Sequence, residues 1–232
     1  MKQIKLVIFA VLILLNACTG VAPTNSLPTI IPSATTIPSA TPLPQPTATP
    51  GPKPLTFSGN GDGMVDLLAK WEGPAVMHVT YDGGGNFIVS TLDAGDSTTG
   101  LLINISGSAR YEGTVPLDFM AGLATAKLKI KASGAWTVDV FPLLREYLHV
   151  LTLPGKYEGK GDDVVYFNGE PATGTFEAKQ QRGFFAVFAF AEKRVELINT
   201  NNPYSGQVDF PPGTNLIVVN STYEWTLDAT KR

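Results

Sequence analysis

The stretch FSGNGDGMVDL, residues 57–67, returns later in the chain as YEGKGDDVVYF, residues 157–167. Both versions open on an aromatic ring, contain Gly-x-Gly-Asp and close on an apolar residue. Three further pairs follow in the same order: Leu102-Ile103-Asn104 with Leu197-Ile198-Asn199, Tyr111-x-Gly113 with Tyr204-x-Gly206, and Trp136-Thr137 with Trp225-Thr226. This shared order predicts two copies of one unit, residues 55–142 and 150–232, with residues 143–149 as the joint between them.

Both copies consist of short segments typical of strands, separated by turn residues. In KLKIKA, residues 127–132, Leu128 and Ile130 alternate with polar or small residues, which is typical of a strand with one side in water. Gly, Asn and Asp gather between such segments, where turns favour residues that tolerate positive backbone φ angles. Units of this size suit small β-sandwiches, so the sequence predicts an all-β chain with two tandem β-sandwich domains.

Two features are expected in the interiors of these domains. Trp136 and Trp225 recur at matching places, so we expect both to be mostly buried, near the end of the last strand of each copy. The segment GFFAVFAFA, residues 183–191, is apolar at almost every position. This composition predicts a central strand that is covered on both sides.

The N-terminus has the pattern of an export signal. Lys2 and Lys5 precede LVIFAVLILL, residues 6–15, which is shorter than the roughly 20 apolar residues that span a bilayer. Leu15-Asn16-Ala17-Cys18 follows, and Cys18 is the only cysteine, so no intramolecular disulfide can form. This stretch resembles the lipobox of bacterial lipoproteins. The resemblance implies that the signal peptide, residues 1–17, is removed and that Cys18 receives fatty-acyl chains such as palmitate. The protein would then be lipid-anchored to the cell membrane on its extracytoplasmic side.

Residues 18–54 form a segment rich in proline and threonine. The run IPSATTIPSATPLPQPTATPGPKP has no hydrophobic periodicity, and its prolines remove the donors that helices and sheets need. It predicts a disordered stalk that populates extended polyproline II, whose rise is near 3.1 Å per residue. At that rise the stalk would reach at most about 110 Å from the bilayer. The same composition is found in O-glycosylated stalks, and whether this one is glycosylated stays open.

Three elements of the repeat carry a second resemblance: ring-x-Gly-x-Gly-Asp near the start, Asn-Phe-x-Val in the middle and Trp-Thr at the end. The pattern is similar to jelly-roll-like repeats found in exported bacterial lipoproteins of uncharacterised function. It implies that the two sandwiches are jelly-roll-like. It brings no active site with it.

Composition and motifs argue against several functions. The formal net charge is −3 and no basic cluster is present, which argues against nucleic acid as a partner. Only two histidines occur, and His78 lies in the strand-like AVMHVTY without an evident nucleophile, so the chain is not expected to be an enzyme. A carboxylate pair acting on polysaccharide stays open as an alternative, because carboxyl groups distant in sequence can meet in a fold.

Aspartates in Gly-rich loops raise the question of calcium, which prefers oxygen ligands. The candidates are Asp62, Asp93, Asp96, Asp162 and Asp163. The alternative is that these side chains close turns through hydrogen bonds to nearby backbone N–H groups, one to three residues later. We prefer the turn interpretation, so no cofactor is expected.

A ligand surface is the last candidate feature. Trp71 lies beside a turn and, with Tyr81 and Tyr111, could offer a flat stacking surface for sugar. The sequence therefore predicts a membrane-anchored, surface-displayed, non-enzymatic lipoprotein with a binding or structural role at the cell envelope. Its partners would be the membrane and a glycan, cell-wall or protein ligand. The alternatives are a carbohydrate-binding or calcium-dependent adhesion module and a carboxylate-based polysaccharide hydrolase.

Overall fold

The computed structural model describes residues 53–107, 110–179 and 183–232 of the chain. All of them belong to one compact unit, Thr49–Arg232. The expected signal peptide, Cys18 and nearly all of the stalk lie outside the described residues. The described ranges are mostly β-strand, with a short 3₁₀ helix, η1 (Arg145–Tyr147), and they contain no helix long and apolar enough to cross a membrane.

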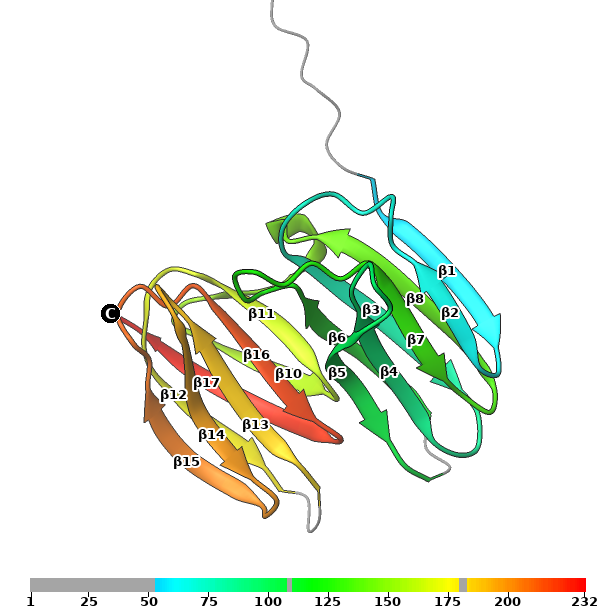
Figure 1. Ribbon diagram of the computed structural model, residues 1–232. Coiled ribbons are helices and arrows are strands. Elements are labelled where there is room, and N and C mark those ends of the chain that lie inside the picture. Colours follow the sequence, from blue (N-terminus) through cyan, green and yellow to red (C-terminus); the bar gives the residue numbers. More distant parts are fainter. Residues whose placement is uncertain (1–52, 108–109, 180–182) are drawn as a thin grey trace, which may run out of the picture. The chain divides into compact units, whose positions relative to one another are not determined.

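The first copy folds into two facing four-stranded sheets, which we call the first sandwich (Figure 1). Its strands are β1 (Leu55–Asn60), β2 (Gly63–Asp66), β3 (Ala75–Asp82), β4 (Phe87–Leu92), β5 (Thr98–Ile105), β6 (Tyr111–Leu117), β7 (Lys127–Lys131) and β8 (Ala135–Pro142). One sheet has the order β1-β8-β3-β6 and the other β2-β7-β4-β5. Each pair of neighbouring strands is antiparallel.

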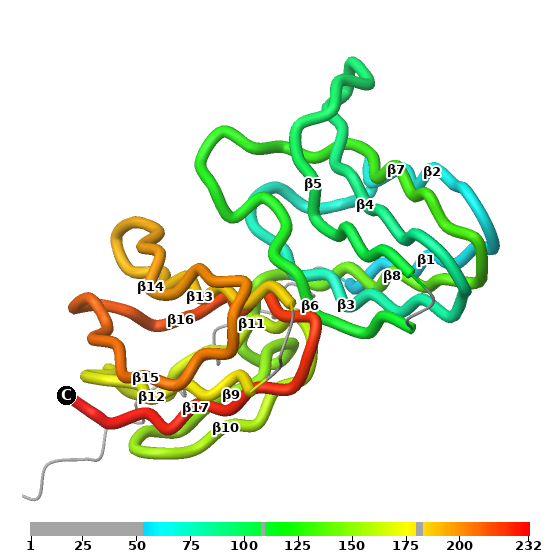
Figure 2. Tube along the Cα trace, turned by 90° about the horizontal axis from the view of Figure 1, so that it is seen from below, coloured from blue at the N-terminus to red at the C-terminus, as the bar shows by residue number. Residues whose placement is uncertain are grey.

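The second copy repeats this arrangement and adds one strand (Figure 2). Its strands are β9 (His149–Thr152), β10 (Gly155–Lys160), β11 (Asp163–Asn168), β12 (Pro171–Ala178), β13 (Phe185–Phe190), β14 (Arg194–Thr200), β15 (Tyr204–Asp209), β16 (Leu216–Ser221) and β17 (Glu224–Lys231). The sheet orders are β10-β17-β12-β15 and β14-β13-β16-β11-β9, with β9 parallel to β11. Without β9, both copies have the two-sheet order of an eight-stranded jelly roll, which confirms the predicted all-β tandem fold.

Each sandwich has its own core, built from alternate residues of facing strands. In β3 the inward positions are Met77, Val79 and Tyr81, and all three are buried. Trp136 and Trp225 are 6% and 1% exposed, so their predicted burial is confirmed. Both lie near the start of the last strand, β8 or β17, rather than near its end.

The repeated Gly-x-Gly-Asp motif forms the turn that receives each tryptophan. The indole N–H of Trp136 donates to the carbonyl oxygen of Gly61 at 2.9 Å, and that of Trp225 donates to Gly161 at 3.1 Å. Both glycines have positive φ angles, 80° and 73°, a backbone conformation that residues with a side chain rarely adopt. The turn therefore satisfies the polar atom of a buried ring, as a buried indole requires.

The aspartate of each motif bonds to the end of the strand next to its own in the same sheet, β7 or β16. Asp62 accepts the backbone N–H of Ala132 at 3.0 Å, and Asp162 accepts that of Ser221 at 2.9 Å. The expectation of bonds to residues one to three positions later was wrong for this pair. The glycine turn directs each carboxylate toward the segment that leads into the tryptophan strand, so the bond joins distant parts of the chain.

A third apolar cluster joins the two sandwiches. Its buried members are Val76 from the first copy and Val164, Leu216 and Val218 from the second, packed against Phe119, Phe141, Leu143, Leu148, Phe188 and Phe190. Strand β13 supplies Val187 to the second core on one side and Phe188 to this junction on the other. Residues 183–191 thus contain an internal strand with apolar contacts on both faces, as predicted.

Candidate functional site

The internal repeat separates structural residues from candidate functional ones. Residues shared by both copies support the common fold, whereas polar or aromatic residues found in one copy need another explanation. Strand registers make four positions of the second copy equivalent to different residues in the first: Tyr157 replaces Phe57, Asp163 replaces Gly63, Phe184 replaces Asn86, and Tyr223 replaces Gly134.

All four second-copy residues line one cavity of about 1020 Å³ between the two sandwiches, which we call the cleft. The chain's two histidines, His78 and His149, line it too. Its lining also includes Asp82, Arg110, Tyr111, Glu112, Glu158, Lys160, Asp162, Gly183 and Thr222. A cleft of this size is within the range of small-ligand sites, and such sites occur preferentially between domains.

A polar cluster of three side chains lies in the second-sandwich wall of the cleft. Asp163 is 4% exposed and accepts the Tyr157 hydroxyl at 2.6 Å. Nδ1 of His149 lies 2.9 and 3.0 Å from the two carboxylate oxygens, and the backbone N–H of Val164 donates to one of them at 2.7 Å. The hydrogen bond to Asp163 raises the pKa of His149. Burial, together with the same carboxylate, raises the pKa of Tyr157.

A second aspartate links the two sandwiches at the floor of the cleft. Asp162 accepts the hydroxyl of Tyr111, a first-sandwich residue, at 2.7 Å, and its carbonyl oxygen accepts the backbone N–H of Thr114 at 2.8 Å. Burial raises the pKa of Asp162 and that of Tyr111. The neighbouring Gly161 lies so close to strand β6 that a Cβ there would be 2.8 Å from the carbonyl oxygen of Glu112. This contact fixes the cleft's floor.

The first-sandwich wall of the cleft carries one ion pair and one contact between a histidine and a carboxylate. Nε of Arg110 lies 2.9 Å from the Asp82 carboxylate, with both side chains largely exposed. Nε2 of His78 lies 3.8 Å from the Glu112 carboxylate. Over the whole cleft the acidic lining residues outnumber the basic ones: Asp82, Glu112, Glu158, Asp162 and Asp163 against Arg110 and Lys160.

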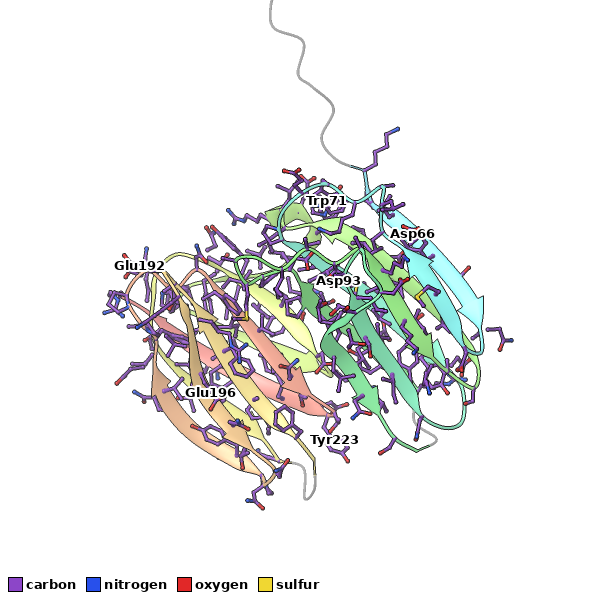
Figure 3. The ribbon with its side chains drawn as sticks, viewed as in Figure 1. Asp66, Trp71, Asp93, Glu192, Glu196 and Tyr223 are labelled. Atoms are coloured by element: carbon purple, nitrogen blue, oxygen red, sulfur yellow. The ribbon has the colours of Figure 1, made fainter. Side chains whose placement is uncertain are left out.

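The predicted aromatic surface is not present. Tyr81 and Tyr111 are 2% and 6% exposed, and their rings pack on Phe87 inside the first core, so only their hydroxyl ends reach the cleft. Trp71 lies in the β2–β3 loop, partly buried against that core, and Figure 3 places it at the other end of the strands from Tyr223. The prediction failed because Tyr81 shares the inward face of β3 with Met77 and Val79.

The calcium candidates do not converge. Asp93 accepts the backbone N–H groups of Gly95 and Ser97, each at 2.9 Å, which is the turn role preferred for it. Asp96 lies 2.5 Å from Nζ of Lys127. Within the described ranges no group of three or more His, Cys, Asp or Glu side chains is placed to hold a metal ion.

Sequence reasoning missed Phe184, Tyr223 and His149 as site residues and treated Asp163 as a turn residue, with calcium binding as the alternative. A signal was available, because aligning the copies on Gly-x-Gly-Asp and Trp-Thr places Gly63 opposite Asp163. The joint strand β9 has no counterpart in the first copy, so nothing in the repeat pointed to His149.

Comparison with known proteins adds no identity. No protein-family model and no curated protein matches the chain. Among solved structures, the chain is similar to a component of "Structure of the Macrobrachium rosenbergii Nodavirus", with 10% identity, 90% of this chain and 96% of that chain covered, and a TM-score of 0.17. A score that low supports no conclusion about this chain. Fold and site together define a class: a tandem jelly-roll protein with a cleft between its two halves.

Proposed function

We propose that this chain is a membrane-anchored, exported lipoprotein that binds a ligand at the cell envelope without chemical turnover, and that the cleft is its binding site. The observation that carries the proposal is that four of the second copy's departures from the first line this one cleft. The fold itself does not need these residues, because the first sandwich forms the same sheets without them.

The bonding of the polar cluster favours binding over catalysis. Asp163 accepts bonds from Tyr157, from Val164 and from His149, so its oxygens are engaged. Nucleophilic catalysis would need a hydroxyl or thiol hydrogen-bonded to a histidine. In the part of the chain that the structure describes, Asp163 is the only side chain that forms a hydrogen bond with His149.

The expected anchor and stalk give this binding role a place. The lipobox-like residues 15–18 would fix the N-terminus to the membrane, since two acyl chains are enough for stable attachment. A Pro/Thr-rich stalk would then hold the sandwiches away from the bilayer. That arrangement suits contact with the wall or with material outside the cell.

Blocking the cleft tests the proposal whatever the ligand is. Thr222 is an exposed residue of the cleft, so Thr222→Cys followed by a bulky maleimide should obstruct it. We expect the labelled full-length protein, in detergent, to lose its retention on purified wall fragments and envelope polysaccharide. An acylated Cys18 does not react with maleimide, so the introduced thiol is the one modified.

The matched control is Leu101→Cys with the same label, because Leu101 is 58% exposed and lies outside the cleft. It should retain binding. Equal retention of the two labelled proteins would exclude the cleft as the binding site.

A further inference from the structure

Two large aromatic side chains in the cleft are exposed to water. Phe184 is 42% exposed and Tyr223 is 39% exposed, and both occupy positions that are small or polar in the first copy. An aromatic ring exposed to water in a concave site lacks the stabilisation that burial would give it until a ligand covers it. Their position therefore points to a partner with an apolar face.

The two rings lie on adjoining chain segments and one of them is firmly supported. Phe185, the first residue of β13, pairs with Ser221, the last residue of β16. Phe184 comes just before the one and Tyr223 just after the other, so both lie at the same end of the two strands. A Cβ at Gly183 would lie 2.2 Å from the Tyr223 ring, so the ring rests directly on the glycine backbone. The second sandwich thus holds the tyrosine ring against its surface before any ligand arrives.

The rest of the cleft supplies planar hydrogen-bonding groups. Carboxylate, guanidinium and imidazole groups come from Asp82, Arg110, Glu112 and His78. Arg110 is paired with Asp82, and acidic groups outnumber basic ones along the cleft, which disfavours an anionic polymer. Alternating donors and acceptors suit the hydroxyl groups of a neutral molecule, which both donate and accept.

We infer that the cleft binds the sugar rings of a neutral polysaccharide, with Tyr223 and Phe184 stacking on the apolar C–H faces and the paired polar side chains bonding the hydroxyl edges. This inference rests on the proposed binding function and names its ligand class. Sugar rings combine an apolar face with a polar rim, which is the combination that this cleft presents.

The test is affinity electrophoresis of the full-length, acylated protein in detergent. The gels contain dextran, a soluble β-glucan, xyloglucan or galactomannan. We expect at least one of these to retard the wild-type protein, and Tyr223→Ala and Phe184→Ala each to raise its apparent Kd at least tenfold. Leu101→Ala, which removes an exposed apolar side chain elsewhere, should leave it unchanged.

Three results would overturn the inference. The first is that none of the four polysaccharides retards the protein. The second is that retardation is the same in both aromatic variants as in the wild type. The third is that the protein no longer binds envelope material pretreated with protease but still binds material pretreated with periodate. That result would identify a protein ligand and leave the cleft as a binding site.

Discussion

The contact between a glycine and a tryptophan explains at the residue scale why the chain repeats one short phrase. A Cβ at Gly59 would lie 2.3 Å from the Trp136 ring, and one at Gly159 would lie 2.2 Å from the Trp225 ring. Any side chain there would overpack a filled core, at a cost of about 1–3 kcal/mol. The shared glycines and tryptophans are therefore explained by packing, and no ligand is needed to account for them.

The proposed lipidation depends on a single residue, Cys18. Replacing Cys18 with serine removes the thiol that would carry the acyl chain, so Cys18→Ser should abolish fatty-acid labelling and leave the precursor uncleaved. Labelling with a radioactive or clickable fatty acid, followed by electrophoresis, measures both effects.

Asn16→Ala serves as the control, because a small residue at that position fits the lipobox pattern and should permit normal labelling. A serine variant that still fractionates with membranes after cleavage at the same site would show that the anchor is not at Cys18.

At the scale of elements, β9 makes the joint part of the wall of the cleft. It pairs in parallel with β11 and brings His149 beside Asp163, which the first copy cannot reproduce because it has Gly63 there. The domain boundary expected after residue 149 thus falls inside the strand His149–Thr152. Strand patterns in the repeat did not predict β9, because strand β10 lies between it and its partner β11 in the chain and its register depends on the assembled sheet.

The His149–Asp163 pair should make stability depend on pH near neutrality. The pKa of His149 is raised in the folded state by its hydrogen bond to Asp163. Its contribution to the free energy of unfolding is therefore complete below the unfolded-state pKa, near 6.5, and is lost as pH rises through the higher folded-state value. Because His149 is more than half exposed, the loss should be about 1 kcal/mol or less.

Urea denaturation between pH 5.5 and 8.5 measures this dependence. His149→Asn should flatten the curve in this range. Besides Asp163, the titratable groups that line the adjoining pocket with His149 are His78, Glu112 and Tyr147. An unchanged curve in the His149 variant would mean that the pair does not set the pH response.

At the scale of the whole molecule, the repeat was readable from sequence and the cleft was not. Sheet membership follows from short alternating patterns and from echoes such as Trp136 and Trp225. The way the copies meet depends on outward residues, including Phe188 and Val218. In the sequence these residues indicate only strands that are apolar on both faces, and they do not say what covers the outer face. The site lies at that meeting place, so its residues could not be assembled from either copy alone.

The outward residues that form the junction on one copy differ from those at the equivalent positions of the other copy. Val218 belongs to the apolar junction, whereas the register places Lys129 at the equivalent position of the first copy. Phe141 likewise corresponds to Thr230 on the second copy, which bonds to Thr173. At these two positions the equivalent surface of the other copy is therefore polar.

Exchanging one of these residues tests that account. Val218 is 3% exposed, so Val218→Lys would place an unpaired charge in an apolar junction and should lower the free energy of unfolding by about 3 kcal/mol or more. The cores of the two sandwiches do not include Val218, so protease should cut first in the loosened joint around residues 143–149. The reverse change, Lys129→Val, alters the surface of β7 and should change stability by less than about 0.5 kcal/mol. If Val218→Lys were as mild as Lys129→Val in denaturation and limited proteolysis, the apolar junction would not be what holds the two sandwiches together.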